Sequence, residues 1–139
     1  MLAWLLAAHV FGVLLWAAGV LGAGRALIDR ARLASPPPEL DGAARRLLLG
    51  SAYPGMTLAI IAGGWAISLN PSYYLKEGWT IAKLAAAALA VASTVVLWVA
   101  ATRLGARPGA VGERALRLWR GLFMGAVAAA LLFVFVKPL

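Results

Sequence analysis

The sequence predicts an all-α integral membrane protein whose four transmembrane helices form an up-down bundle. Two observations carry this prediction: four long apolar stretches, and a composition too poor in polar residues for a water-soluble protein. Of the 139 residues, 63% are hydrophobic and 13% are charged, and the mean hydropathy is +0.88. The connections between the stretches are short, so consecutive helices are expected to run antiparallel.

The apolar stretches cover residues 2–27, 47–69, 79–102 and 118–136. Each has about the ~20 residues that cross a hydrocarbon core of ~30 Å. The first stretch has no Lys or Arg ahead of it and is longer than the core of a typical secretory signal, so we expect it to remain a mature helix. Residues 1–139 are therefore expected to form a single four-helix transmembrane domain.

Proline, glycine and polar residues mark the connections. Residues 35–38 read Ser-Pro-Pro-Pro and should interrupt the first helix, and Asp41 is expected to N-cap the next one. Residues 70–72 end the second span, and Trp79 is an aromatic residue suited to the outer interface. Residues 105–112 contain the glycines and the proline that break the third connection.

The basic residues predict the orientation of the chain. The formal net charge is +8, and most arginines flank the first and third connections: Arg25, Arg30, Arg32, Arg45 and Arg46, then Arg103, Arg107, Arg114, Arg117 and Arg120. With four spans these connections share one face, which the positive-inside rule makes cytoplasmic. Both termini are then expected to be outside. The pattern is typical of a topology signal and of contact with anionic lipid in the bilayer, and we expect no nucleic-acid partner.

Small residues recur at four-residue spacing in three of the spans. They are Ala8 and Gly12, then Gly55, Ala59 and Gly63, and finally Gly121, Gly125 and Ala129. Such stripes allow close backbone approach, so we expect them to face neighbouring helices, within the bundle or in a homo-oligomer. A lining of Gly and Ala also leaves room for a flat ligand, and both interpretations stay open.

His9 and Lys83 are ionisable side chains inside apolar spans. His9 lies ~12 Å along the first helix and Lys83 ~8 Å along the third, and these helices run in parallel, so both residues are expected in the outer half of the membrane. Gly12 and Trp16 share the helix face of His9, and Thr94 shares that of Lys83. A lysine in a membrane costs ~3 kcal/mol on insertion scales, which favours a function. The alternative is that Lys83 snorkels to the interface while His9 bonds a carbonyl or water.

The two nitrogen ligands could hold a haem between the first and third helices. Neutral imidazole is a common axial ligand of haem iron, and a lysine amine coordinates once it has lost its proton. With no cysteine the chain has no disulfide, thiolate site or covalent haem attachment. One histidine and scattered methionines, Met1, Met56 and Met124, make a sulfur-rich Cu(I) site a poor candidate.

Four segments carry a set of motifs in order: residues 9–19 (HVFGVLLWAAG) followed by Arg25, then Pro54-Gly55-Met56, residues 75–84 (LKEGWTIAKL), and the ending Val136-Lys137-Pro138-Leu139. Together they resemble the HemJ-type protoporphyrinogen IX oxidases. The resemblance implies a haem b protein of the bacterial inner (plasma) membrane that oxidises protoporphyrinogen IX to protoporphyrin IX. His9 and Lys83 match the positions of the family's proposed iron ligands. The electrons would pass to a quinone or a respiratory component.

Three further residues, Trp16, Trp79 and Arg25, are candidates for lining or anchoring the tetrapyrrole. An aromatic belt and interfacial snorkelling explain them as well.

The chain also departs from the family's pattern. Residues 80–82 (Thr-Ile-Ala) stand where members commonly carry a His, residues 120–121 (Arg-Gly) replace an Asn-Glu pair, and residues 29–30 (Asp-Arg) replace a Tyr-His pair. Three alternatives therefore stay open: a diverged haem-binding relative without oxidase activity, a copper transport or resistance protein of the CopD type, and a small structural subunit without a cofactor.

Overall fold

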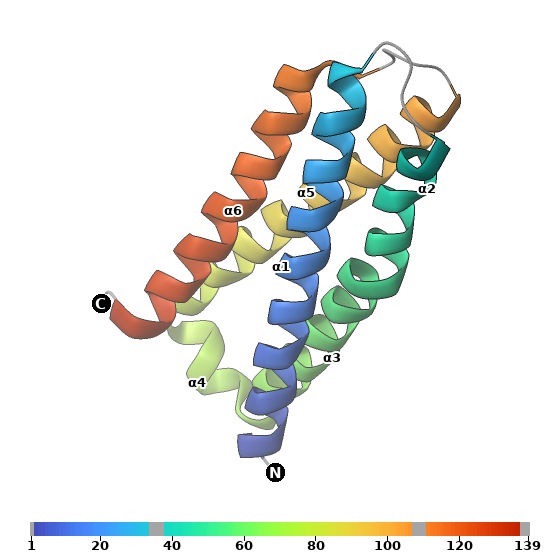
Figure 1. The fold of residues 1–139 in the computed structure, drawn as a ribbon. Coiled ribbons are helices and arrows are strands. Elements are labelled where there is room, and N and C mark those ends of the chain that lie inside the picture. Colours follow the sequence, from blue (N-terminus) through green and yellow to red (C-terminus); the bar gives the residue numbers. More distant parts are fainter. Residues whose placement is uncertain (1, 34–37, 107–110, 137–139) are drawn as a thin grey trace.

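Four long helices pack side by side in the computed structural model, which describes residues 2–33, 38–106 and 111–136 (Figure 1). In chain order the elements are α1 (Leu2–Arg32), α2 (Pro38–Leu47), the π-helix η1 (Leu48–Ala52), α3 (Tyr53–Leu69), α4 (Pro71–Lys76), α5 (Gly78–Ala106) and α6 (Glu113–Val136). The long helices alternate in direction, so α1 begins and α6 ends at the same end of the bundle. The predicted all-α bundle is confirmed.

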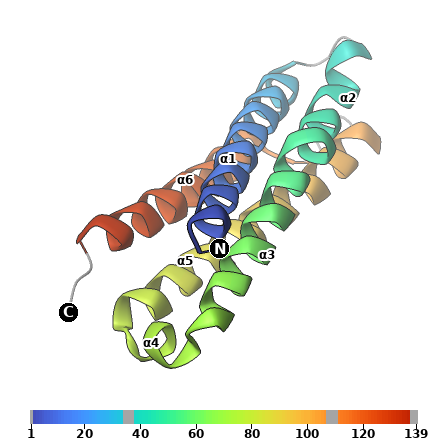
Figure 2. The ribbon, with the colours of Figure 1, turned by 90° about the horizontal axis from the view of Figure 1, so that it is seen from below.

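Four helical segments are long and apolar enough to cross a membrane, as the sequence predicted. They are Ala3–Arg32, Gly42–Leu69, Gly78–Leu104 and Glu113–Leu132. Figure 2 shows α1 between α3 on one side and α6 on the other, and α5 packs against α6. We call the end where α1 and α5 finish and α6 starts the arginine-rich end, and the opposite end the outer end.

The second span is one continuous helix with a π-turn inside it. The Tyr53 N–H donates to the carbonyl oxygen of Leu48, a bond over five residues. Pro54 follows directly and has no N–H, and its ring would clash with the carbonyl of Gly50 in a regular α-helix. The wider turn of η1 separates these groups, so the π-turn is the local consequence of Pro54.

Two details of the connections differ from the sequence prediction. The helix expected to start at Asp41 already begins at Pro38, which can occupy a first helical turn, so Asp41 lies inside α2 and is not its N-cap. Residues 70–72 do end the second span, but a short helix, α4, follows before α5 begins.

Glycines bring α1 and α3 into backbone contact. A Cβ on Gly12 would lie 2.6 Å from the nitrogen of Ala59, and one on Gly55 would lie 2.6 Å from the oxygen of Gly12. Gly19 is equally close to the backbone of Ala52. Association in lipid depends on such close packing, because lipid tails are as apolar as side chains. The two small-residue stripes of the first and second spans therefore face each other.

The third stripe behaves differently. Gly121 and Gly125 are exposed, and a Cβ on either would meet nothing within 4 Å. They do not pack within the bundle, because α6 turns Leu116, Phe123 and Ala126 into the core instead, and their packing in a homo-oligomer stays a prediction.

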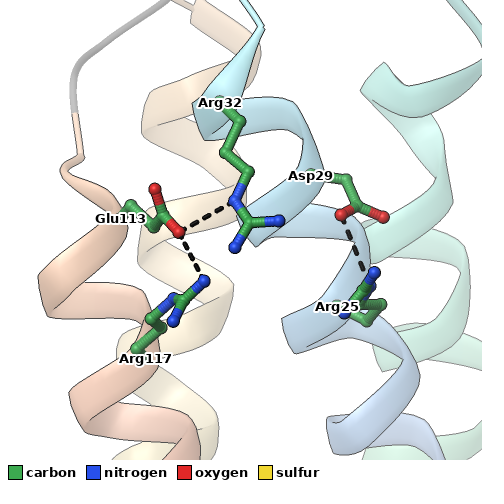
Figure 3. A network of polar contacts seen from close by, with 5 residues as sticks. All are labelled: Arg25, Asp29, Arg32, Glu113 and Arg117. Carbon is green, nitrogen blue, oxygen red and sulfur yellow. Dashed lines mark hydrogen bonds and ion pairs between the residues drawn. The ribbon is translucent and has the colours of Figure 1, made fainter.

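Polar contacts join the helices at the arginine-rich end (Figure 3). Glu113 accepts from Arg32 at 2.8 Å and from Arg117 at 2.7 Å, which ties the end of α1 to the start of α6. Arg30 is only 6% exposed and donates to the carbonyl oxygen of Leu104, near the end of α5. Arginines thus satisfy a helix C-terminus here as well as facing the surface.

Candidate functional site

His9 lies on α1 with its part-buried imidazole against α3. Its Nδ1 is 2.7 Å from the carbonyl oxygen of Ala59. A carbonyl oxygen only accepts hydrogen bonds, so Nδ1 carries the proton and donates. In the neutral imidazole this leaves the lone pair of Nε2 free, and a second-shell carbonyl of this kind is the usual support of a metal-bound histidine. The same hydrogen bond is also expected under the alternative in which His9 has only a structural role.

Gly63 gives the imidazole its space. A Cβ on Gly63 would lie 2.9 Å from Nδ1 and 3.0 Å from Cε1 of His9, which is closer than any normal contact. The next residue, Gly64, points elsewhere, since a Cβ there would meet nothing within 4 Å. The His9 ring therefore rests on a patch of α3 that has no side chain, and Gly63 belongs to the site.

Lys83 comes from the outer part of α5, ~8 Å beyond the start of this helix. It is part-buried and close enough to His9 for the two side chains to interact electrostatically. Because α1 and α5 run in the same direction, both residues lie toward the outer end of the bundle. The structure thus brings together the two residues that the sequence singled out.

Deeper in the bundle, the face of α1 that carries His9 meets the face of α5 that carries Lys83. Trp16 Nε1 donates to Thr94 Oγ1 at 2.8 Å, and this hydroxyl in turn donates to the Ala90 carbonyl at 2.8 Å. The Trp16 ring also makes an edge contact with Phe123 of α6, with centroids 5.6 Å apart. Trp16 is 5% exposed, so it is a core residue that joins three helices beneath the pair.

Trp79 and Thr80 form the first turn of α5, next to Lys83. Trp79 lies one turn before Lys83 on the same face and is part-buried. Thr80 is 4% exposed, and its Oγ1 has no hydrogen-bond partner among the described residues. A buried hydroxyl without a partner costs about 1–3 kcal/mol of folding free energy, so a bound polar group that pairs with it would be stabilised. Its position was noted in the sequence only as a departure from the family pattern.

Arg25 lies away from these residues. It is sixteen residues beyond His9, ~24 Å along α1, and belongs to the arginine-rich end. Its side chain is 64% exposed and lies 3.4 Å from Asp29, one turn further along α1 (Figure 3). A ligand held by His9 and Lys83 would not reach it, so the structure does not support Arg25 as part of the same site.

The described residues contain no cluster of three or more His, Cys, Asp or Glu side chains that could hold a metal ion. A haem brings four of its own nitrogen ligands and requires only axial ones from the protein, so His9 and Lys83 would suffice for haem but not for a free ion. Comparisons with protein families, with curated proteins and with solved structures find no match to this chain.

The sequence did not reveal what supports His9. Ala59 and Gly63 were recognised only as members of a small-residue stripe, and nothing in their type distinguishes a carbonyl acceptor or a seat for imidazole from ordinary helix packing. The four-residue spacing of Ala59 and Gly63 was a usable signal nonetheless. Residues four apart lie next to each other on one helix face, so a single side chain from another helix can contact both.

Proposed function

We propose that the chain is a haem b-binding membrane oxidoreductase that oxidises protoporphyrinogen IX to protoporphyrin IX, in which His9 and Lys83 would hold the haem iron. The observation that carries the proposal is the hydrogen bond from His9 Nδ1 to the Ala59 carbonyl, which leaves the lone pair of Nε2 to point at a ligand, while Lys83 is part-buried toward the same end of the bundle. The activity itself rests on the resemblance to the HemJ-type oxidases.

The residues present fit such a group. The imidazole is fixed in the tautomer that coordinates through Nε2, and Gly63 lets it stay in this position. Lys83 is part-buried in the outer part of α5, from which its amine would supply the second ligand. Thr80 adds a buried hydroxyl that has no hydrogen-bond partner in the part of the chain that the structure describes, and Trp79 adds an aromatic surface one turn before Lys83 on α5.

A bound haem would supply a one-electron redox centre between the substrate and an acceptor of the quinone or respiratory class. In this reaction the protein's own residues would orient the haem ligands and shield them from water. Ala59 holds the His9 ring, Trp16 and Phe123 close the bundle beneath it, and the apolar helices keep bulk water from the pair. The porphyrinogen, as an apolar ring with acidic side arms, would approach from the outer end, toward which His9 and Lys83 lie.

An absorbance spectrum of the detergent-purified protein tests the cofactor. We expect a Soret band with α and β bands that sharpen on reduction, and loss of most haem in His9→Ala and in Lys83→Ala. Lys76→Ala is the matched control, since Lys76 is an exposed lysine at the same end, and it should retain haem. A wild-type protein without a Soret band, after expression with sufficient haem, would refute the proposal.

Growth rescue of cells that lack protoporphyrinogen oxidase tests the reaction separately. Rescue by the wild type and not by His9→Ala supports the oxidase. If the protein binds haem but does not rescue growth, the diverged relative without oxidase activity is favoured, in agreement with the residues that differ from the family pattern, Thr80 and Arg120 among them. A spectrum of bound copper in place of haem would favour the CopD-type alternative.

We also propose that the protein lies in the bacterial inner membrane with both termini outside, which makes the arginine-rich end cytoplasmic. The support is the charge distribution: the arginines of α1, α5 and α6 gather at one end of the described bundle, whereas Lys76 and Lys83 are on the side of the other. A reporter fused to the C-terminus that functions only in the periplasm would be active under this topology.

A further inference from the structure

We propose that Arg120 is the anchor of a binding site for the phosphate group of an anionic phospholipid, in the seam between α1 and α6 at the arginine-rich end. This inference is independent of haem binding. It concerns a cation inside the fourth span that the proposed oxidase site does not use.

The side chain of Arg120 is seated on Gly24 of α1. A Cβ on Gly24 would lie 2.9 Å from Cδ, 3.2 Å from Cγ and 3.5 Å from Nε of Arg120. The stem therefore crosses the surface of α1 at a position where the helix has no side chain. An arginine that only extended into lipid would leave Gly24 uncovered, so the contact fixes where the guanidinium lies.

The arginines around Arg120 have ion-pair partners. Arg25 lies against Asp29, and Arg32 and Arg117 share Glu113 (Figure 3). For Arg120 the described part of the chain offers no ion pair, and its Nε is buried without a hydrogen-bond acceptor. A guanidinium in a membrane span is costly unless an anion or a set of acceptors faces it.

The surroundings favour an anion from the membrane. Among Arg25, Arg32, Arg117 and Arg120 there are four positive charges, and Asp29 and Glu113 supply two negative ones, so this part of the surface keeps an excess of two positive charges. Arg120 is seven residues, ~10 Å, from the start of α6, and helical side chains lean toward the N-terminus of their helix. The guanidinium therefore lies toward the lipid headgroups at this end, and its planar fork matches two oxygens of a phosphate.

Titration with short-chain lipids tests the site in the purified full-length protein. We expect short-chain phosphatidylglycerol to raise the thermal unfolding midpoint, while phosphatidylcholine of the same chain length has a much smaller effect. In Arg120→Gln the half-saturating concentration of phosphatidylglycerol should rise about tenfold, as expected for loss of a charge-assisted bidentate contact. Arg114→Gln is the matched control, because Arg114 is an exposed arginine on the same helix. It should change the value less than about twofold.

Two further variants cover the case in which Arg120→Gln does not fold. Arg120→Lys keeps the charge but not the fork, and Gly24→Ala displaces the stem of Arg120; each should weaken phosphatidylglycerol binding more than Arg114→Gln does. Equal weakening by the Arg120 and Arg114 variants would show diffuse charge attraction and refute the site. Stabilisation by inorganic phosphate alone, at the same concentrations, would refute a lipid as the source of the phosphate.

Discussion

Trp16 on α1 donates a 2.8 Å hydrogen bond to the hydroxyl of Thr94 on α5, seventy-eight residues away in the sequence. The bond lies in the buried centre of the bundle, and Thr94 is fully buried. It joins the helices that carry His9 and Lys83, and so contributes to the relative position of the two proposed ligands.

A double-mutant cycle measures this link. Thr94→Val leaves the indole N–H buried without an acceptor and should cost about 1–3 kcal/mol of stability, whereas Trp16→Phe together with Thr94→Val should cost less than the sum of the single changes. The measurement is unfolding in mild detergent, and Thr102→Val, at an exposed threonine of the same helix, is the control. Additive losses would mean that Trp16 and Thr94 are not coupled in the folded protein.

Adjacent glycines on α3 test the seat of His9. Gly63→Ala places a methyl group 2.9 Å from Nδ1, so the imidazole should move and lose its bond to Ala59. We expect Gly63→Ala to reduce haem retention to a large extent and Gly64→Ala to leave it unchanged, as judged by the Soret absorbance per protein. If both variants retain haem equally, the orientation of His9 by α3 is irrelevant to binding.

The backbone contact between α1 and α3 predicts a second contrast between glycines. Gly55→Ala forces a methyl group to within 2.6 Å of the Gly12 carbonyl oxygen, and the neighbour is backbone that cannot turn aside. Overpacking of this kind costs about 1–3 kcal/mol or more, whereas Gly125→Ala has open space. Thermal unfolding of the two variants should differ clearly, and similar midpoints would contradict the close helix pair.

Two arginines at the same end should differ in their contribution to stability. Arg30 is buried and bonded to the Leu104 carbonyl, so Arg30→Gln should cost about 1.5–3 kcal/mol, the range of hydrogen bonds to charged groups. Arg32 is 43% exposed in its ion pair with Glu113, so Arg32→Gln should cost less than about 1 kcal/mol, and added salt should reduce that cost further. Chemical unfolding at low and high salt distinguishes the two.

The four spans and their alternating directions were predictable because each crossing of a membrane requires ~20 apolar residues, and stretches of this length and composition can be found directly in the sequence. The placement of His9 and Lys83 toward one end followed from counting residues along parallel helices. The match of the α1 and α3 stripes followed in the same way, since small residues at four-residue spacing favour close contact.

What the sequence could not provide depends on which face of each helix turns inward. Nearly uniform apolarity removes the periodic signal that identifies the buried face of a soluble helix. The sequence therefore could not decide whether the glycines of α6 face the bundle or a second copy, and Phe123 and Leu116 occupy the core instead. For the same reason Trp16 was a candidate to line a cofactor, and only its contacts with Thr94 and Phe123 identify it as a packing residue.

The π-turn at Leu48–Ala52 has a consequence for the geometry of the second span. One residue turns an α-helix by ~100°, so the additional residue in this turn sets α2 and α3 out of phase by about that angle. On one side of the turn Arg45 stacks over Trp98, 5.3 Å from the ring centroid, and on the other side Ala59 and Gly63 receive His9. Deleting one residue of the turn would break one of these alignments. The π-turn therefore allows the second span to contact α5 on one side of the turn and α1 on the other, in different directions.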